Sequence, residues 1–529
     1  MKYLLPLPVV ALFVAAGPES RPADSFQFKT PSGVTYTVTA EGLSEVRLGK
    51  RLLARGGWRF RVGNRIWGLP AGPDEEAIAS RAIEIVSPTE ARVTHRHADV
   101  LARYTFAFRG EDVRIDSWVE NHHPTAAIPV AAFEGPKVFF GRTPHGILPN
   151  WHPTYTAAGG VPCMHPGGIR IGGSYGVGDG FGVGAAPHDA GVHPTALLWD
   201  WNWSPGKREA DPERTPKLYV HAPIPAGGAR TFAVTFRFSP DTDWKHLLYP
   251  YRRHLYAVVG DRLLYKPGND LPYAAGFACG NESHRSATNP HAFDPNHRLD
   301  SVSGVMTYHA AVAPTMRAIS AQGIIVWCQG GLNPRGAMYR PDFDAMPPDI
   351  SDNVARLAGL FREQGFRFGV ATRPGQMVTP LDWKTDTVCR INPAEQDQLE
   401  LLTRRFNTMI AAGSSLFYLD SFGNRIEDVA IMRAVRNGVG KQPGIGPDVR
   451  TFVEHPSDVI IPFSGLLPVL VRNGAEGKLT LAFEGAFWVH PPETPDMPEV
   501  MRYFYPDVSI ACLIAVQGAN TEARQRPVV

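Results

Sequence analysis

The sequence of 529 residues predicts a multidomain protein of β plus α/β class, with an N-terminal antiparallel β-sandwich followed by a (β/α)8-type (TIM) barrel. Two observations lead to this prediction. Before about residue 240, short runs of alternating apolar and polar residues are separated by turn signals, as in a large antiparallel sandwich. After residue 243, strand-like and helix-like segments alternate, which is typical of parallel β/α units.

The predicted sandwich domain occupies residues 25–240, with strands expected at 34–39, 91–97, 104–108, 113–119, 137–140, 216–220 and 230–238. A linking helix is expected within 241–265, because residues 244–259 are amphipathic. The catalytic barrel is predicted at 266–529. Its strands are expected at 274–279, 324–328, 367–372, 416–420, 450–454 and 479–484, and its helices at 303–321 (broken at Pro314), 351–364, 395–412, 426–438 and 498–503. Segments 466–471 and 508–516 would bring the number of strands to eight.

The first 16 residues predict a signal peptide. A charged start at Lys2 precedes an apolar run, and the small residues Val14 and Ala16 fit cleavage after Ala16. The run is shorter than the roughly 20 residues that a membrane span needs. We therefore expect an exported protein, either secreted or periplasmic.

The composition argues against several classes of partner. A formal net charge of +2, with scattered Lys and Arg, argues against nucleic acid, and five cysteines without a CxxC pair predict neither a disulfide framework nor a zinc site. Segment 281–300 is rich in His, Asp and Asn but lacks metal-ligand spacing, so we expect a loop over the barrel mouth and no metal or cofactor. The glycine-rich stretch 172–180 does not match GxGxxG, and we expect a glycine-lined bend or loop.

Asp420 is the first candidate for catalysis. It ends the apolar run Leu416-Phe417-Tyr418-Leu419, which reads as a strand buried on both faces. In β/α barrels the side chains at the carboxyl ends of strands converge on one active-site mouth. The alternative is a structural role, in which Asp420 caps the helix that starts near Ile426 or shapes the turn after the strand.

Three further carboxylates are candidates for the second catalytic group. Glu454 ends another apolar strand and is the first choice for a general acid, although a salt bridge or cap at this junction is the structural alternative. Asp458 follows in the same loop and is either an alternative acid, a substrate contact or a helix N-terminal residue. Glu484 ends the expected 479–484 strand, and substrate hydrogen bonding is its expected role.

The remaining residues at the strand ends resemble a sugar site. Arg373 offers a planar fork of donors for hydroxyl groups or a carboxylate, with an ion pair to a nearby aspartate as the alternative. Trp327, Gln329 and Trp488 supply aromatic faces and an amide, although each tryptophan also suits core packing. An oligosaccharide or polysaccharide is the expected substrate.

Tyr418-Leu419-Asp420, at the end of the fourth barrel strand behind a β-sandwich, resembles the glycoside hydrolases of the alpha-galactosidase (melibiase) and alpha-glucosidase type. The resemblance implies a retaining cleavage of α-glycosidic bonds with Asp420 as nucleophile. In that family the acid is generally an aspartate after the sixth strand, where this sequence offers Glu484. With Glu454 as acid and base, the chain would form a divergent branch.

Two other functions fit the same sequence. A non-catalytic glycan-binding or cell-envelope protein on the same scaffold would bind sugars without cleaving them, because a fold does not determine a function. A metal-dependent hydrolase would use the ligand-rich segment 281–300 and would lose activity with a chelator.

Overall fold

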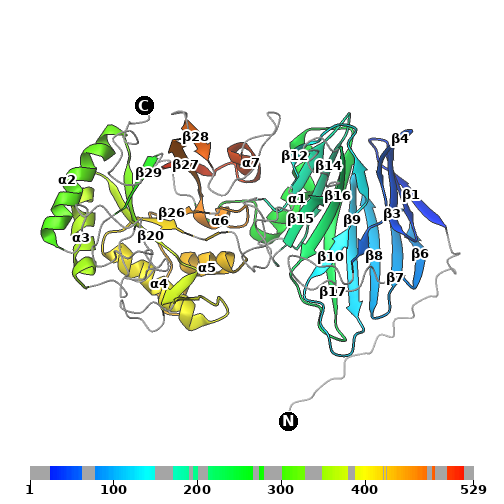
Figure 1. The fold of residues 1–529 in the computed structure, drawn as a ribbon, viewed down its shortest axis with the longest axis horizontal. Helices are drawn as coiled ribbons and strands as arrows, with labels where there is room; N and C mark the ends of the chain where they lie inside the picture. Colours follow the sequence, from blue (N-terminus) through cyan, green and yellow to red (C-terminus); the bar gives the residue numbers. More distant parts are fainter. Residues whose placement is uncertain are drawn as a thin grey trace, which may run out of the picture.

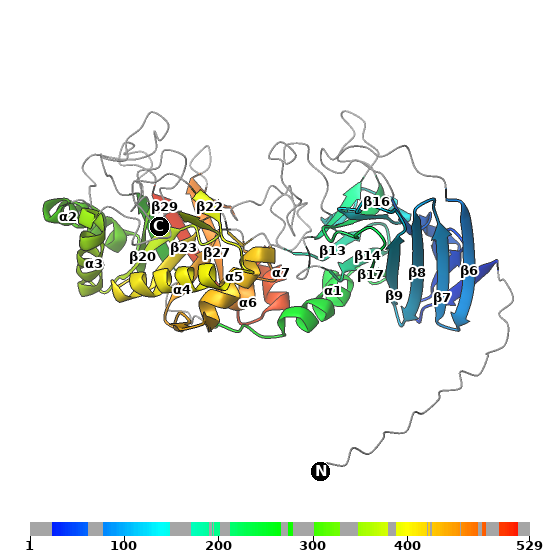
Figure 2. The same cartoon turned by 90° about the horizontal axis from the view of Figure 1, so that it is seen from below.

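The computed structural model describes residues 24–61, 78–148, 171–189, 193, 195–200, 212–265, 273–278, 301–327, 348–378, 388–420, 422–423, 426–454, 456–473, 479–482 and 497–516. Two bodies lie side by side along the longest axis of the molecule, a β-sandwich and a body of strands and helices (Figure 1). Helix α1 (Trp244–Val259) lies at the junction between them, as the view from below also shows (Figure 2).

The sandwich consists of two antiparallel sheets. The first has the order β1-β2-β3-β4-β11-β16-β10-β5, with β15 also paired to β16, and the second has the order β12-β13-β14-β17-β9-β8-β7-β6. The strands of the first sheet are β1 (Ser25–Lys29), β2 (Val34–Thr39), β3 (Gly42–Leu48), β4 (Arg51–Arg55), β5 (Arg59–Phe60), β10 (Ala131–Glu134), β11 (Lys137–Phe139), β15 (Thr195–Asp200) and β16 (Glu213–Val220). Those of the second are β6 (Ser80–Ser87), β7 (Glu90–Arg96), β8 (Val100–Arg109), β9 (Asp112–Asn121), β12 (His145–Ile147), β13 (Ser174–Val177), β14 (Gly182–Pro187) and β17 (Ala229–Ser239).

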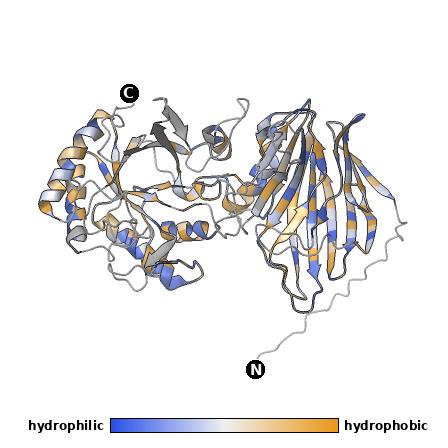
Figure 3. Cartoon of the chain, in the orientation of Figure 1, coloured by the Kyte–Doolittle hydropathy of each residue, from blue (hydrophilic) through white to orange (hydrophobic). Residues whose placement is uncertain are grey.

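These two sheets pack face to face because buried and half-buried residues alternate along their strands. In β2, Val34, Tyr36 and Val38 are fully buried, while the residues between them are half-buried on the opposite face. The same alternation of apolar and polar residues is visible along the sandwich strands in Figure 3. Between the sheets, the ring of Trp58, directly before β5 of the first sheet, meets that of Phe236 from β17 of the second, with their centroids 5.6 Å apart. The predicted β-sandwich is confirmed.

The second body contains an eight-stranded sheet of order β26-β23-β20-β19-β18-β29-β27-β28. Its strands are β18 (Tyr273–Ala278), β19 (Gly323–Trp327), β20 (Arg367–Thr372), β23 (Leu416–Leu419), β26 (Arg450–Val453), β27 (Leu466–Asn473), β28 (Leu479–Ala482) and β29 (Ser509–Val516). Two short hairpins pair β21 (Gln376–Val378) with β22 (Val388–Arg390) and β24 (Gly438–Val439) with β25 (Gln442–Pro443). The helices are α2 (Val302–Ala318), α3 (Pro348–Glu363), α4 (Gln396–Ala411), α5 (Ile426–Asn437), α6 (Ile461–Ser464) and α7 (Met497–Phe504).

The two faces of this sheet have different partners. One face forms a small cluster drawn from every parallel strand, namely Ala274, Ile325, Ala371, Leu416, Tyr418, Phe452, Leu466 and Ala511. The opposite face, which includes Val326, Val370 and Leu419, packs against the helices. The sheet therefore curls around the small cluster, and β26 also lies against β27. Among the described residues the hydrogen-bonded order ends at β26 and β28, so the predicted closed eight-stranded barrel is not shown.

Two predictions for the second body were wrong. The strand expected at 479–484 is β28, and it runs antiparallel to β27, so its carboxyl end lies at the opposite edge from those of its parallel neighbours. Helix α2 continues through Pro314 although a proline removes one helical hydrogen bond. Val312 and Met316 on either side of the proline are buried against the sheet, and this packing holds the helix together.

Glycines explain how α1 lies so close to the sandwich. A Cβ atom at Gly182 would approach Leu247 Cδ1 of α1 to 2.4 Å, and one at Gly184 would approach the Leu247 carbonyl oxygen to 2.0 Å. The glycine-rich stretch expected to form a bend or loop continues into strand β13, and Gly173 in front of it similarly faces the ring of Tyr251. The largest hydrophobic core runs without a break from β13 and β14 through α1 to the helices of the second body.

The junction also contains a partly buried histidine, His188, that makes stability depend on pH. The ring of His188, after β14, lies 4.6 Å from that of His254 in α1, and its Nε2 is 2.8 Å from Thr235 Oγ1. Burial lowers the pKa of His188 from 6.5 to about 3. Below about pH 6.5 the unfolded chain therefore binds a proton that the folded chain does not, and stability falls with pH.

We expect this histidine to cost about 2 kcal/mol of stability between pH 7 and pH 5. A His188→Gln variant keeps a hydrogen-bonding side chain without this titration, so it should lose less stability over the same range. Urea denaturation at both pH values measures the difference. Equal losses in wild type and variant would show that the proton uptake lies elsewhere.

Candidate active site

Strand register brings three polar residues to one level at the carboxyl edge of the parallel sheet. Arg373, Asp420 and Glu454 directly follow β20, β23 and β26, which are neighbours in the sheet. The residues before them are paired, Thr372 with Leu419 and Leu419 with Val453. Two hydrogen bonds extend this ladder, from Asp420 N to the Thr372 carbonyl (2.8 Å) and from Glu454 N to the Leu419 carbonyl (3.1 Å).

The same three residues belong to the enclosed face of the sheet. Side chains alternate along a strand, and Ala371, Tyr418 and Phe452, each two positions earlier, belong to the small cluster that the sheet surrounds. Arg373, Asp420 and Glu454 therefore form a row above this cluster, which we call the edge row. This is the face on which barrel enzymes carry their catalytic side chains.

Arg373 and Asp420 form an ion pair within the edge row, between the guanidinium Nε and Asp420 Oδ2. The two side chains are only 22% and 12% exposed, so the pair is largely shielded from water. The aspartates that the sequence offered as alternative partners of Arg373, Asp382 and Asp386, lie outside the described residues. Parallel pairing of β20 with β23 brings together Arg373 and Asp420, which are 47 positions apart.

The turn after Asp420 is held by a residue that the sequence analysis missed. Asp428 Oδ2, in the first turn of α5, accepts a hydrogen bond of 2.8 Å from Gly423 N. Gly423 has a φ of 106°, which strongly favours glycine, and the Phe422 side chain is fully buried. An acidic residue in the first turn of a helix, shortly after a glycine turn, was the available signal. Asp428 thus performs the turn-shaping role considered for Asp420.

Asp458 lies away from the edge row, between the two bodies. Its side chain has no exposure, and its Oδ2 accepts hydrogen bonds from Tyr251 Oη of α1 (2.7 Å) and from Gly172 N in front of β13 (3.0 Å). A substrate does not reach a fully buried carboxylate in this arrangement. We therefore assign Asp458 to the contact between the bodies and not to substrate binding or proton transfer.

The other sequence candidates are described only in part. Trp327 is the last residue of β19, which places its backbone near the same edge, while Gln329, Glu484 and Trp488 lie outside the described residues, as does the segment 281–300. Within the described part of the chain, no group of three or more His, Cys, Asp or Glu side chains is placed to hold a metal ion. The helices described here are all too short or too polar to cross a membrane.

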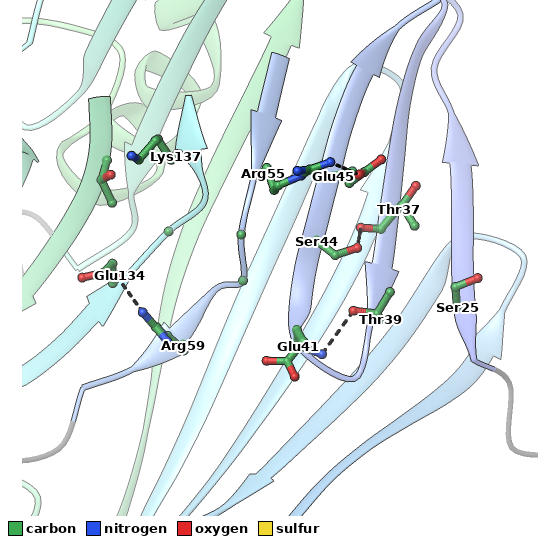
Figure 4. A pocket seen from close by; sticks show the side chains of 14 residues that line it. Ser25, Thr37, Thr39, Glu41, Ser44, Glu45, Arg55, Arg59, Glu134 and Lys137 are labelled. Atoms are coloured by element: carbon green, nitrogen blue, oxygen red, sulfur yellow. Dashed lines mark hydrogen bonds and ion pairs between the residues drawn. The ribbon is translucent and has the colours of Figure 1, made fainter. Parts of the chain in front are cut away.

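A groove lies in the sandwich, far from the edge row. This groove of about 800 Å³ runs over the outer face of the first sheet, and its labelled side chains are shown in Figure 4. Its charges are paired, with Arg59 3.0 Å from Glu134 and Arg55 3.2 Å from Glu45. No aromatic ring is among the lining residues, so the groove lacks the stacking surface expected of a sugar site.

The chain thus consists of a β-sandwich joined by a helix to a curled, mostly parallel sheet with carboxylates at its carboxyl edge. The chain is similar over 86% of its length to the alpha-N-acetylgalactosaminidase NagBb from Bifidobacterium bifidum, of which it covers 87%, with a TM-score of 0.54 and 12% identity. The GH36 alpha-galactosidase AgaA from Geobacillus stearothermophilus aligns over 96% of this chain and 80% of its own, with a TM-score of 0.38 and 9% identity. No family model and no curated protein matches the sequence.

Proposed function

We propose that the protein is a glycoside hydrolase that cleaves α-glycosidic bonds in oligosaccharides or polysaccharides. The observation that carries this proposal is the edge row, in which two carboxylates and an arginine lie side by side on the enclosed face. The α-linkage is supported by the fold shared with an alpha-N-acetylgalactosaminidase. Export to the periplasm or the medium belongs to the same proposal and is supported by the apolar start of the sequence.

In the proposed reaction Asp420 attacks the anomeric carbon while Glu454 protonates the departing glycosidic oxygen. Glu454 then takes a proton from the water that hydrolyses the glycosyl ester on Asp420. Neighbouring strands are about 4.8 Å apart, which suits the separation of about 5 to 5.5 Å between carboxyl groups that retention requires. Arg373 provides a positive charge next to Asp420 and holds its carboxylate in one orientation.

The proposal includes a closed barrel around the small cluster. Its support is that every parallel strand contributes to the cluster and that β26 lies against β27. Carbohydrate would enter over the edge row, with Trp327, Gln329 and Trp488 as the proposed sugar contacts. Glu484 is left out because it follows β28, whose carboxyl end lies at the opposite edge. Aromatic faces stacking on sugar C–H groups would orient the ring above Asp420.

The test is a screen of the purified protein against aryl α- and β-glycosides and against plant, algal and bacterial polysaccharides, with release of reducing ends as the signal. Cleavage of α-linked substrates with retained anomeric configuration supports the proposal. Binding of a glycan without cleavage would instead favour a glycan-binding protein. Cleavage that is abolished by a chelator and restored by a metal would favour a metal-dependent hydrolase.

Replacing the proposed acid should make the rate depend on the leaving group. Glu454→Gln is expected to lower kcat about 10² to 10⁴-fold on natural glycosides, which need a proton on the departing oxygen. A dinitrophenyl glycoside needs no proton and should lose much less.

The matched controls are Glu484→Gln and Glu476→Gln, because Glu476 follows β27, which is the sixth parallel strand along the chain. Both controls should keep the leaving-group profile of the wild type. If one of them loses natural substrates selectively while Glu454→Gln does not, that residue is the acid.

A further inference from the structure

The loop that carries Glu454 is tied to the sheet at both of its ends. At its start, Glu454 N donates to the Leu419 carbonyl, directly before Asp420. At its far end, helix α6 is held by Ser464 Oγ, which donates to the Thr451 carbonyl of β26 over 3.1 Å. Between these ties the chain turns at Ser457, whose carbonyl accepts from Ile460 N over 3.0 Å. Residues 454–460 therefore form a short connection with little freedom at its ends.

The middle of the same loop is held by the other body. Asp458 accepts hydrogen bonds from Tyr251 of α1 and from Gly172 N of the sandwich, and its own carbonyl accepts from Tyr505 Oη over 3.0 Å. Tyr251 Oη also accepts from Gly172 N over 3.1 Å, so the three groups form one closed arrangement. These partners lie 207, 286 and 47 positions away in the chain.

This arrangement is buried, and the Tyr251 hydroxyl in it stays protonated. Asp458 is 0% and Tyr251 1% exposed. Burial, with the nearby Asp458 charge as a second cause, raises the pKa of Tyr251 well above 10, so its hydroxyl remains a donor at any ordinary pH. If Asp458 lost this donor, its buried carboxylate would be left with an unsatisfied hydrogen-bonding position, which is destabilising. We expect the loop to move so that the carboxylate reaches water or another donor.

We propose that Tyr251 and Asp458 form a positioning pair, through which α1 and the sandwich hold the 454–460 loop so that Glu454 can transfer protons at the edge row. The proposal rests on the proposed function, and neither residue touches substrate. The sandwich thereby contributes to the chemistry of the second body through the three residues of chain between Glu454 and Asp458.

The test compares Tyr251→Phe with Tyr503→Phe. The first variant removes one hydroxyl, which donates to Asp458 and accepts from Gly172 N. The second is the matched control, because Tyr503 Oη donates to the Lys245 carbonyl over 2.7 Å and so joins α7 to α1 without a bond to the loop. Thermal unfolding measures how much stability each variant loses, and kcat and KM are measured well below both unfolding temperatures.

Tyr251→Phe is expected to lower kcat at least about tenfold on a natural glycoside with KM within about threefold. The loss should shrink on a dinitrophenyl glycoside, because only proton donation is impaired, and Tyr503→Phe should show neither effect. Asp458→Asn, which keeps an oxygen acceptor for Tyr251, should retain more kcat than Asp458→Ala. A kcat and leaving-group profile of Tyr251→Phe equal to those of Tyr503→Phe would overturn the proposal.

Amide hydrogen exchange of residues 454–460 measures how firmly the loop is held, and it does not require any glycosidase activity. If the wild type cleaves no glycoside, the proposed function fails, but the exchange experiment still decides whether the pair positions the loop. Faster exchange of these amides in Tyr251→Phe than in Tyr503→Phe supports positioning. Equal exchange in the two variants overturns it, whatever the activity of the wild type.

Discussion

Asp420→Asn is expected to lower kcat on glycosides by at least about a hundredfold, with little change in the free energy of unfolding. An amide does not attack the anomeric carbon, whereas it has almost the shape of the carboxylate and can still accept a hydrogen bond from Arg373. The turn behind it is held by Asp428 and should remain intact. Steady-state kinetics and thermal unfolding of the same preparations measure both quantities.

Glu427→Gln is the matched control for this substitution. Like Asp420→Asn, it replaces an acid by its amide. Glu427 lies a few residues further on, at an exposed position in the first turn of α5. It should keep the activity of the wild type. A 2-fluoro glycosyl fluoride should in addition leave a covalent label on Asp420, detectable by mass spectrometry of the peptide. If Asp420→Asn is as active as the wild type, Asp420 is not the nucleophile and serves only as the ion-pair partner of Arg373.

Gly184→Ala is expected to have the largest effect on stability. The new Cβ would lie 2.0 Å from the Leu247 carbonyl oxygen and 2.8 Å from its carbon, so the obstacle is backbone and no side-chain rotation relieves it. Helix α1 would have to move away from β14. We expect a loss of about 3 kcal/mol, at the upper end of the range for overpacking, measured by chemical denaturation.

Gly359→Ala provides the comparison. This glycine lies inside helix α3, and a Cβ there meets no atom within 4 Å. Alanine should therefore stabilise the protein by about 0.5 to 1 kcal/mol, because it loses less backbone entropy in a helix than glycine. If Gly184→Ala is as stable as the wild type, α1 does not lie on β14 as described.

Local patterns were sufficient to predict much of the fold. The amphipathic run 244–259 coincides with α1, and the apolar run before Asp420 coincides with β23. Both elements depend on periodicity within a few residues, which the sequence displays directly. The order and direction of strands depend on distant partners, and so the antiparallel course of β28 was not foreseen.

The same distinction holds for the candidate site. Asp420, Glu454 and Arg373 were found because each ends an apolar strand, and parallel pairing of those strands brings them together. The burial of Asp458 depends on Tyr251 and Gly172, more than 200 positions away. No local pattern distinguishes such a buried contact from an exposed carboxylate at a loop.

Because the hydrophobic core is continuous across the junction, we expect that the gene cannot be divided into two fragments that each fold stably. Tyr175 and Val177 of the sandwich share one core with Val305 and Phe504 of the second body. A fragment beginning after α1 would expose this apolar surface to water and should aggregate. Neither half is therefore expected to fold stably without the other. The two halves are expected to unfold together, in a single cooperative transition.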